Sequence, residues 1–187
     1  MSYGITRDEA LALVEERLES PNLIKHCLAT EAVMRALALR FDEDPEKWGL
    51  AGLLHDLDAE TQPDLAIHTQ ETEEILREKG VDAEIIEAIG MHNELARDRK
   101  RASIFEHALA AGETITGLIV ATALVYPEKK LASVKPKSVR KRIKEKVFAA
   151  GANRDIIREC ELIDIPLDEF CNLCLEAMQT VSDDLGL

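Results

Sequence analysis

Aromatic residues are scarce in this sequence, with four Phe, two Tyr and one Trp among 187 residues. Sheets draw on aromatic and β-branched residues in alternation, and few such runs occur here. Glycine and proline are also sparse, at nine and six residues, and no segment repeats or is of low complexity. These absences exclude collagen-like, repeat and disordered architectures and leave little from which to build a sheet.

Cysteines and long hydrophobic runs are equally limited. Cys27, Cys160, Cys171 and Cys174 are too few and too scattered for a disulfide framework, so we expect reduced thiols. The longest apolar run, residues 117–126, is far shorter than the roughly 20 residues that span a bilayer. The N-terminus lacks the basic start and apolar run of a signal peptide. We therefore expect a cytoplasmic protein with no membrane association.

Basic residues are in deficit overall, with 23 Lys or Arg against 36 Asp or Glu and a net charge of −13. This charge opposes a chain-wide role in binding nucleic acid or anionic membranes. Residues 129–146 reverse the balance, with nine Lys or Arg against one acid and a local charge of +8. Such a run is usually a solvated face. Here it could also attract a phosphorylated ligand or dock onto an acidic surface of a second subunit, as in a homodimer.

Helical periodicity is present along almost the whole chain, and the predicted fold class is all-α. Thr6-x-x-Glu9 and Ser103-x-x-Glu106 read as capping boxes, and Asp44-Pro45 reads as a helix start. Length and a hydrophobic content of 46% fit a single domain over residues 1–187. The predicted helices cover about residues 7–19, 23–40, 45–57, a segment ending at 79–80, one beginning after 82, then 104–126, 137–150, 153–163 and 167–185.

Two patterns predict how these helices pack. Gly49 and Gly52 lie in a helix interior, where glycine costs stability, so they indicate close backbone contact or room for a ligand. The last helix has an apolar seam with alternating spacings of four and three, which favours packing within the chain or across a dimer. Its members are Leu167, Cys171, Cys174, Met178, Val181 and Leu185. The two cysteines in it are therefore interpreted as core residues, not a redox or zinc pair.

Four of the five histidines lie in the first half of the chain, each on or beside a predicted helix. They are His26, His55, His68 and His92. A single inward histidine is more often a hydrogen-bonded core residue than a ligand. Together with Asp56, which follows His55 at a helix C-terminal end, they form a nitrogen and oxygen donor set suited to Mn, Fe, Co, Ni or Zn.

The order of these residues, followed by an acid on a long later helix, resembles the HD superfamily of metal-dependent phosphohydrolases. The stretches NLIKHCLATEAVMRALA, WGLAGLLHDLD and ALAAGETITGLIVATALV look like the family's helices in the expected order. The later stretch KKLASVKPKSVRKRIKEKVFAAGANRDIIRECE resembles the tail of small single-domain bacterial proteins known as predicted HD hydrolases. The resemblance implies an HD-domain helical bundle, with a core of about residues 20–126 and a C-terminal helical extension of about 127–187.

The resemblance also implies a ligand set. One divalent metal would be held by His26, His55, Asp56 and Glu113, and His68 and His92 would hold a second metal or the substrate phosphate. Glu113 departs from the family pattern, which has Asp there, and its extra methylene shifts the carboxylate. On the same helix, His107 projects about 120° away from Glu113 and is interpreted as a surface or cap-region residue.

A second departure follows the doublet, where family members often carry a Lys. This chain has Asp58 and Glu60 in that region. These acids could orient ligands or activate water, but acidic surface residues at the start of a loop need no function, and we favour the interpretation of both as surface acids. The implied catalytic residues are Asp56 and His92, with Lys25 as a phosphate contact.

The implied activity is metal-dependent hydrolysis of a small phosphorylated metabolite, a nucleotide being one candidate. The cofactor would be one or two divalent ions chosen among Mn, Fe, Co, Ni, Mg and Zn. Two alternatives stay open. Some HD proteins use the same cluster with two irons to activate oxygen, and a weakened site would leave a non-catalytic metal-binding or ligand-binding regulatory module.

Overall fold

The computed structural model describes residues 3–187, and in that range helices and turns make up the whole fold, without a strand. The predicted all-α class is confirmed. The α-helices are α1 (Arg7–Arg17), α2 (Pro21–Arg40), α3 (Pro45–Leu54), α4 (Gln70–Glu78), α5 (Ala83–His92), α6 (Ile104–Leu124), α7 (Pro136–Lys144), α8 (Arg154–Ile157), α9 (Leu167–Thr180) and α10 (Ser182–Leu185). Short 3₁₀ segments cover Glu94–Ala96 (η1), Leu131–Ser133 (η2) and Arg158–Ile163 (η3).

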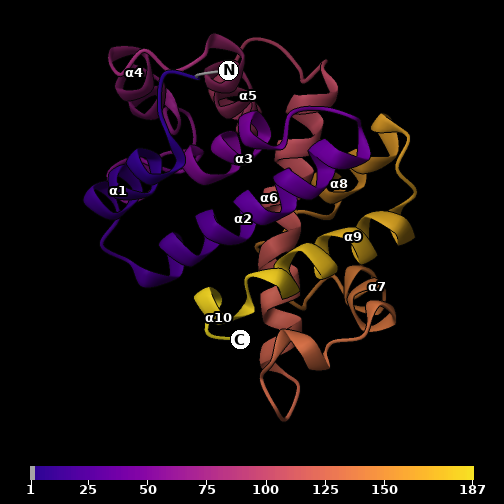
Figure 1. The fold of residues 1–187 in the computed structure, drawn as a ribbon. Helices are drawn as coiled ribbons and strands as arrows, with labels where there is room; N and C mark the ends of the chain where they lie inside the picture. The colour runs from indigo at the N-terminus through magenta and orange to yellow at the C-terminus, as the bar shows by residue number, and fades with distance from the viewer. Residues whose placement is uncertain (1–2) are drawn as a thin grey trace.

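The two longest helices, α2 and α6, cross in the middle of the molecule (Figure 1). On one side α3 packs along α2, α1 and α5 pack on α3, and α4 packs on α5. On the other side α7, α8, α9 and η3 pack against α6, and α9 also packs on α2. The core lies between these groups, because both central helices bury apolar side chains along their length. Helices from distant parts of the sequence therefore meet around α2 and α6.

The contact between α2 and α3 is close enough to explain a glycine. A Cβ added to Gly52 would lie 2.7 Å from the carbonyl oxygen of Thr30, an approach that only glycine permits. At Gly49 an added Cβ would meet the side chain of Arg35 at 2.8 Å. The predicted close backbone contact is therefore confirmed at Gly52, whereas Gly49 faces a side chain.

The predicted helix starts agree with the caps. Thr6 and Ser103 both form complete capping boxes, and the Asp44 carboxylate accepts from the backbone N–H of Glu46. The predicted end of the third helix was wrong. Helix α3 stops at Leu54 instead of near 57, because the backbone N–H of Asp58 donates to the Thr72 hydroxyl at 3.1 Å.

The C-terminal part departs further from the predicted boundaries. Helix α7 ends at Lys144, and the turns that follow it wrap around the guanidinium of Arg154, which donates to the carbonyl oxygens of Glu145, Phe148, Ala149 and Ala152. The segment predicted at 153–163 is a short α-helix continued by η3, and the last helix breaks at Val181. The hydrogen bonds of the Arg154 side chain thus override the helical periodicity of the residues after Lys144.

The predicted apolar seam packs within the chain. Cys171, Cys174 and Met178 are fully buried on α9, which lies against α2, α6 and α7. All four cysteines are free and buried, as expected for reduced thiols. Burial raises the pKa of the Cys160 and Cys171 thiols to about 12, so they act as small core residues.

In residues 3–187 only α6 is long and apolar enough to cross a membrane by length and composition. In this structure 67% of its most apolar 18-residue window is buried by the rest of the protein. Its composition is therefore accounted for by its position as a core helix.

Candidate metal centre

Five elements bring the predicted site residues together from distant parts of the chain. His26 lies on α2, His55 and Asp56 directly follow α3, His68 lies in the turn before α4, His92 is the last residue of α5, and Glu113 lies in the middle of α6. These residues are far apart in the sequence, but the crossing helices and the turns beside them bring their side chains into one region.

Asp56 lies at the centre of this cluster, and its two carboxylate oxygens face different histidines. Oδ2 lies 3.5 Å from Nε2 of His55 and 3.7 Å from Nε2 of His26. Oδ1 lies 3.2 Å from Nε2 of His68 and 3.5 Å from Nε2 of His92. One carboxylate therefore divides the centre into two halves. The first half contains His26 and His55 on the Oδ2 side, and the second half contains His68 and His92 on the Oδ1 side.

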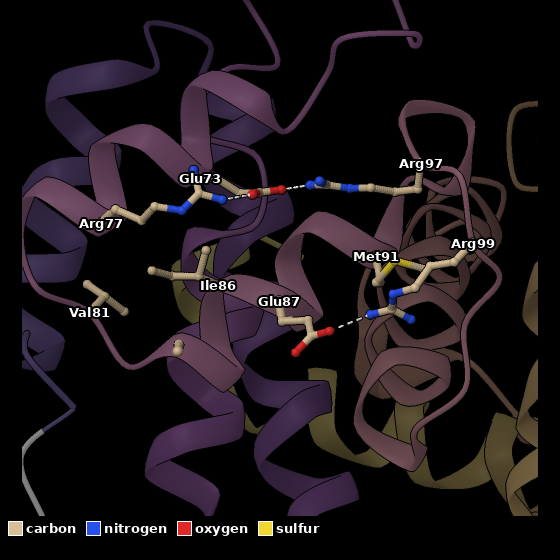
Figure 2. A pocket seen from close by; sticks show the side chains of 9 residues that line it. Glu73, Arg77, Val81, Ile86, Glu87, Met91, Arg97 and Arg99 are labelled. Carbon is tan, nitrogen blue, oxygen red and sulfur yellow. Dashed lines mark hydrogen bonds and ion pairs between the residues drawn. The ribbon is translucent and has the colours of Figure 1, made fainter.

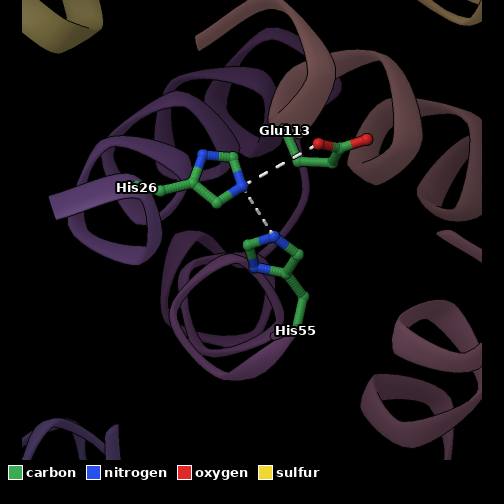
Figure 3. A group of neighbouring side chains, drawn as sticks. All are labelled: His26, His55 and Glu113. Carbon is green, nitrogen blue, oxygen red and sulfur yellow. Dashed lines mark hydrogen bonds and ion pairs between the residues drawn. The ribbon is translucent and has the colours of Figure 1, made fainter. Parts of the chain in front are cut away.

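Glu113 joins the first half (Figure 3). Its Oε2 lies 3.8 Å from Nε2 of His26, and one donor atom each from His26, His55 and Glu113 falls within 4.8 Å of the others. A second group of the same kind consists of His55, Asp56 and His92. Both groups have the size and donor chemistry that a divalent ion needs.

The hydrogen bonds around the histidine rings fix which nitrogen faces inward. Nδ1 of His55 donates to the carbonyl oxygen of Gly52 at 2.9 Å, and Nδ1 of His92 donates to that of Ile89 at 2.7 Å. The Thr116 hydroxyl donates its own hydrogen bond to the carbonyl oxygen of Glu113. It therefore accepts a hydrogen bond from Nδ1 of His26 at 3.0 Å. When each ring carries its proton on Nδ1, its Nε2 has a free lone pair that can bind a metal.

The inward nitrogens fit a bound cation. Nε2 of His26 and Nε2 of His55 lie 3.1 Å apart. With the protons of both neutral rings on Nδ1, two lone pairs face each other, which is unfavourable unless a positive charge lies between them. The C-terminal end of α3 adds partial negative charge from its free carbonyls.

Electrostatics keep the first half ready for a metal. Burial lowers the pKa of His55 to about 3, so this ring stays neutral and able to ligate. Burial opposes the charge on Asp56, but its histidine neighbours, His55 foremost, hold its pKa well below the usual value. Burial raises the pKa of Glu113. A neutral imidazole, an ionised Asp56 and a carboxyl whose ionisation a cation would favour together form a site that lacks positive charge.

His68 has a different environment from the other histidines. Its Nδ1 lies 2.8 Å from Oδ1 of Asp58, and its Nε2 faces Asp56. Burial lowers its pKa, but hydrogen bonds and attraction from the two carboxylates outweigh that effect and raise it to about 9. In the metal-free protein this ring is protonated and holds the two acids together.

The interpretation of Asp58 as a surface acid was wrong. Its side chain is fully buried and accepts from the backbone N–H groups of Thr69 and Thr72 at 2.9 and 3.4 Å. These bonds fix the turn that carries His68. The only sequence signal was the position of Asp58 two residues after the doublet. Glu60, by contrast, is exposed as expected and accepts from the backbone N–H groups of Glu19 and Ser20.

Two other residues lie elsewhere. The ammonium of Lys25 lies beside Gly186, since a Cβ on that glycine would come within 3.1 Å of Nζ, and we leave Lys25 out of the site. His107 is in the cap region of α6 as expected, but it is largely buried and its Nδ1 lies 2.7 Å from Glu159. It contributes to a different cluster from that of Glu113.

The first half of the centre opens into a cleft of about 450 Å³. His26 and Glu113 are its titratable members, and their side chains are 23% and 19% exposed, against 1% for His55. The cleft is also lined by residues of the turns around Arg154 and of α8, namely Ala149, Gly151, Ala152, Asn153 and Ile156. A small molecule in this cleft would touch both the centre and the segment after α7.

A second pocket, of about 430 Å³, is bordered by α4, α5 and the segment after α5 (Figure 2). Its arginines are already paired, Arg77 and Arg97 with Glu73, and Arg99 with Glu87 and Glu106. Its lining lacks the histidine cluster. The metal chemistry therefore belongs to the other cleft.

A helical bundle with a centre of histidines and carboxylates on crossing helices defines a metal-binding all-α protein. The family model of the HD domain matches residues 23–132, more than half of the chain, and the chain belongs to this family. HD proteins are in general metal-dependent phosphohydrolases that bind divalent ions. Neither the curated proteins nor the solved structures include a match to this chain.

Proposed function

We propose that this protein is a metal-dependent phosphohydrolase acting on a small phosphorylated metabolite, with nucleotides as the first class to test. The observation that carries the proposal is the division of the centre by Asp56, whose two oxygens each face a pair of histidine Nε2 atoms. His26, His55, Asp56 and Glu113 would hold one divalent ion. Asp56, His68 and His92 would hold a second.

A divalent ion supplies Lewis acidity toward a phosphoryl oxygen and makes a coordinated water more acidic. The chain's own groups have defined tasks around that chemistry. Asp56 carries the negative charge, His55 stays neutral by burial, and Thr116 and Gly52 orient two of the rings. Burial raises the pKa of Glu113, and a cation beside it would favour the ionised form that binds a metal.

The basic segment supports an anionic substrate. Among the described residues, six of its nine cations have no carboxylate within ion-pair distance, whereas Arg140, Lys141 and Arg142 do. The six are Lys129, Lys130, Lys135, Lys137, Lys144 and Lys146. The segment ends three positions before Ala149, a residue that lines the cleft. Positive potential at this place favours a phosphorylated molecule over a neutral one.

The test is phosphate release from nucleoside phosphates, sugar phosphates and other phosphomonoesters or anhydrides, with Mn, Co, Ni or Mg. We expect a chelator to abolish release and a divalent ion to restore it. Asp56→Asn should lose most of the activity while the protein stays folded, and the loop variant Asp64→Asn should keep it. No release under any condition contradicts the proposal. Oxygen consumption by the iron-loaded protein would then favour an oxygenase. If neither phosphate release nor oxygen consumption is detected, a non-catalytic binding module is favoured.

A further inference from the structure

Arg101 is a buried cation outside the histidine cluster, with only 3% of its side chain exposed. It lies in the segment between α5 and α6. Its Nη1 donates to the carbonyl oxygens of Met91 and His92 at 2.8 and 3.1 Å. These carbonyls belong to the last turn of α5, which has no intrahelical donors for them. The guanidinium therefore caps the end of α5 and also offsets the partial negative charge there.

The other edge of the guanidinium is held by Glu159. Nε and Nη2 of Arg101 donate to its two carboxylate oxygens at 2.7 and 2.8 Å, in a bidentate pair. Glu159 lies on η3, beyond residues 23–132 that match the HD domain. It also binds Nδ1 of His107 on α6 at 2.7 Å. The Arg101–Glu159 clamp thus ties the C-terminal part of the chain to the end of α5.

His92 is the residue at the end of that turn. Its ring is oriented by the carbonyl of Ile89, so the place of its Nε2 follows the backbone of the last turn. That atom lies 3.5 Å from Asp56 and 3.3 Å from Nε2 of His68. A frayed last turn would therefore move His92 away from Asp56.

We propose that Arg101, held by Glu159, is a positioning residue for His92. It fixes the last turn of α5 so that Nε2 of His92 faces Asp56, and in this way the C-terminal part of the chain completes the second half of the metal centre. The inference rests on the proposed function only in treating that half as an ion site. Arg101 is not a catalytic residue, because it acts through the backbone of α5.

The test compares Arg101→Met, Arg101→Lys and Glu159→Gln with a matched control. Arg40→Met removes another ion pair between α2 and the C-terminal part, Arg40 with Glu169 at 2.7 Å, which does not involve α5. Two quantities are measured at a temperature where all variants are folded. They are amide hydrogen exchange of residues 88–93 in the metal-free protein, and Mn²⁺ binding by calorimetry, with His92→Ala identifying the second ion.

We expect Arg101→Met and Glu159→Gln to speed exchange at residues 90–92 by about tenfold or more, and to weaken the second ion by about tenfold, as loss of an outer partner does. The first ion should bind as in the wild type. Arg101→Lys keeps the charge but cannot reach both carbonyls and Glu159, so its exchange rate and Mn²⁺ affinity should lie between those of Arg101→Met and the wild type. Arg40→Met should match the wild type in both measurements.

Exchange and Mn²⁺ affinity equal to those of Arg40→Met would overturn the inference and leave the clamp a structural ion pair. If Arg101→Met does not fold, Arg101→Lys and Glu159→Gln decide. If wild-type protein binds a single Mn²⁺ ion or none, exchange in the metal-free protein decides alone. Absence of phosphate release would count against the proposed function and would leave both measurements valid for the clamp.

Discussion

Nδ1 of His68 lies 2.8 Å from Oδ1 of Asp58, so a buried carboxylate lies behind the histidine of the centre that is in the turn before α4. The other ligand candidates rely on a backbone carbonyl or a hydroxyl for the same purpose. A carboxylate behind an imidazole fixes its orientation and increases its basicity, which strengthens metal binding.

Replacing Asp58 should therefore weaken the second half of the centre. Asp58→Asn keeps an oxygen for the backbone N–H groups of Thr69 and Thr72 but loses the charge behind His68. We expect a loss of about 10-fold to 100-fold in affinity for one of two ions, measured as bound metal after dialysis against a graded chelator. Asp64→Asn, which removes an exposed cap in the same loop, should retain wild-type metal content. Equal metal content in the two variants would disprove the role of Asp58.

The stability of the metal-free protein should depend on the protonation of His68. Its pKa is raised to about 9, so protonation stabilises the fold fully below the ordinary value of about 6.5, and this contribution is lost as pH rises through 9. The loss is on the order of 3 kcal/mol at most. Urea unfolding with a chelator, at about pH 6 and about pH 9.5, should show a gap between wild type and His68→Gln that shrinks at high pH. A constant gap would contradict the assignment.

Two glycine substitutions should have opposite effects on stability. Gly52→Ala places a methyl group against the Thr30 carbonyl, where backbone must move, so we expect a loss of about 2 kcal/mol or more. Gly117→Ala, in the interior of α6, meets no atom within 4 Å and should stabilise the protein by about 0.5–1 kcal/mol. The free energy of unfolding from urea titrations measures both. Equal effects would mean that α2 and α3 can separate without cost.

The basic segment should act through long-range attraction. Charge reversal at Lys135, Lys137 and Lys144, which lack acidic partners in the described chain, should raise the KM for a phosphorylated substrate several-fold at low salt and much less at high salt. Lys79→Glu, an exposed position after α4, should change KM little. If the ratio of the variant's KM to that of the wild type is the same at both salt concentrations, the segment is only a solvated face.

The sequence indicated the histidines around Asp56 through its resemblance to the HD family, and by itself it determined the all-α class and most helix starts. These features are local or periodic, because capping boxes are satisfied within one turn and inward faces repeat every three or four residues. The close contact at Gly52 could also be predicted from the sequence, because glycine in a helix interior lowers stability and therefore indicates a packing role.

Tertiary structure alone decided the burial of Asp58, the placement of Lys25 and the pairing of Arg101 with Glu159. Asp58 looked like a loop acid because its partners, Thr69 and Thr72, lie 11 and 14 positions away. Arg101 and Glu159 are 58 positions apart, and each by itself resembles an ordinary surface charge. A buried charge is tolerated only where other segments supply its partners. The residue pattern within one segment does not show which distant segment will pack against it.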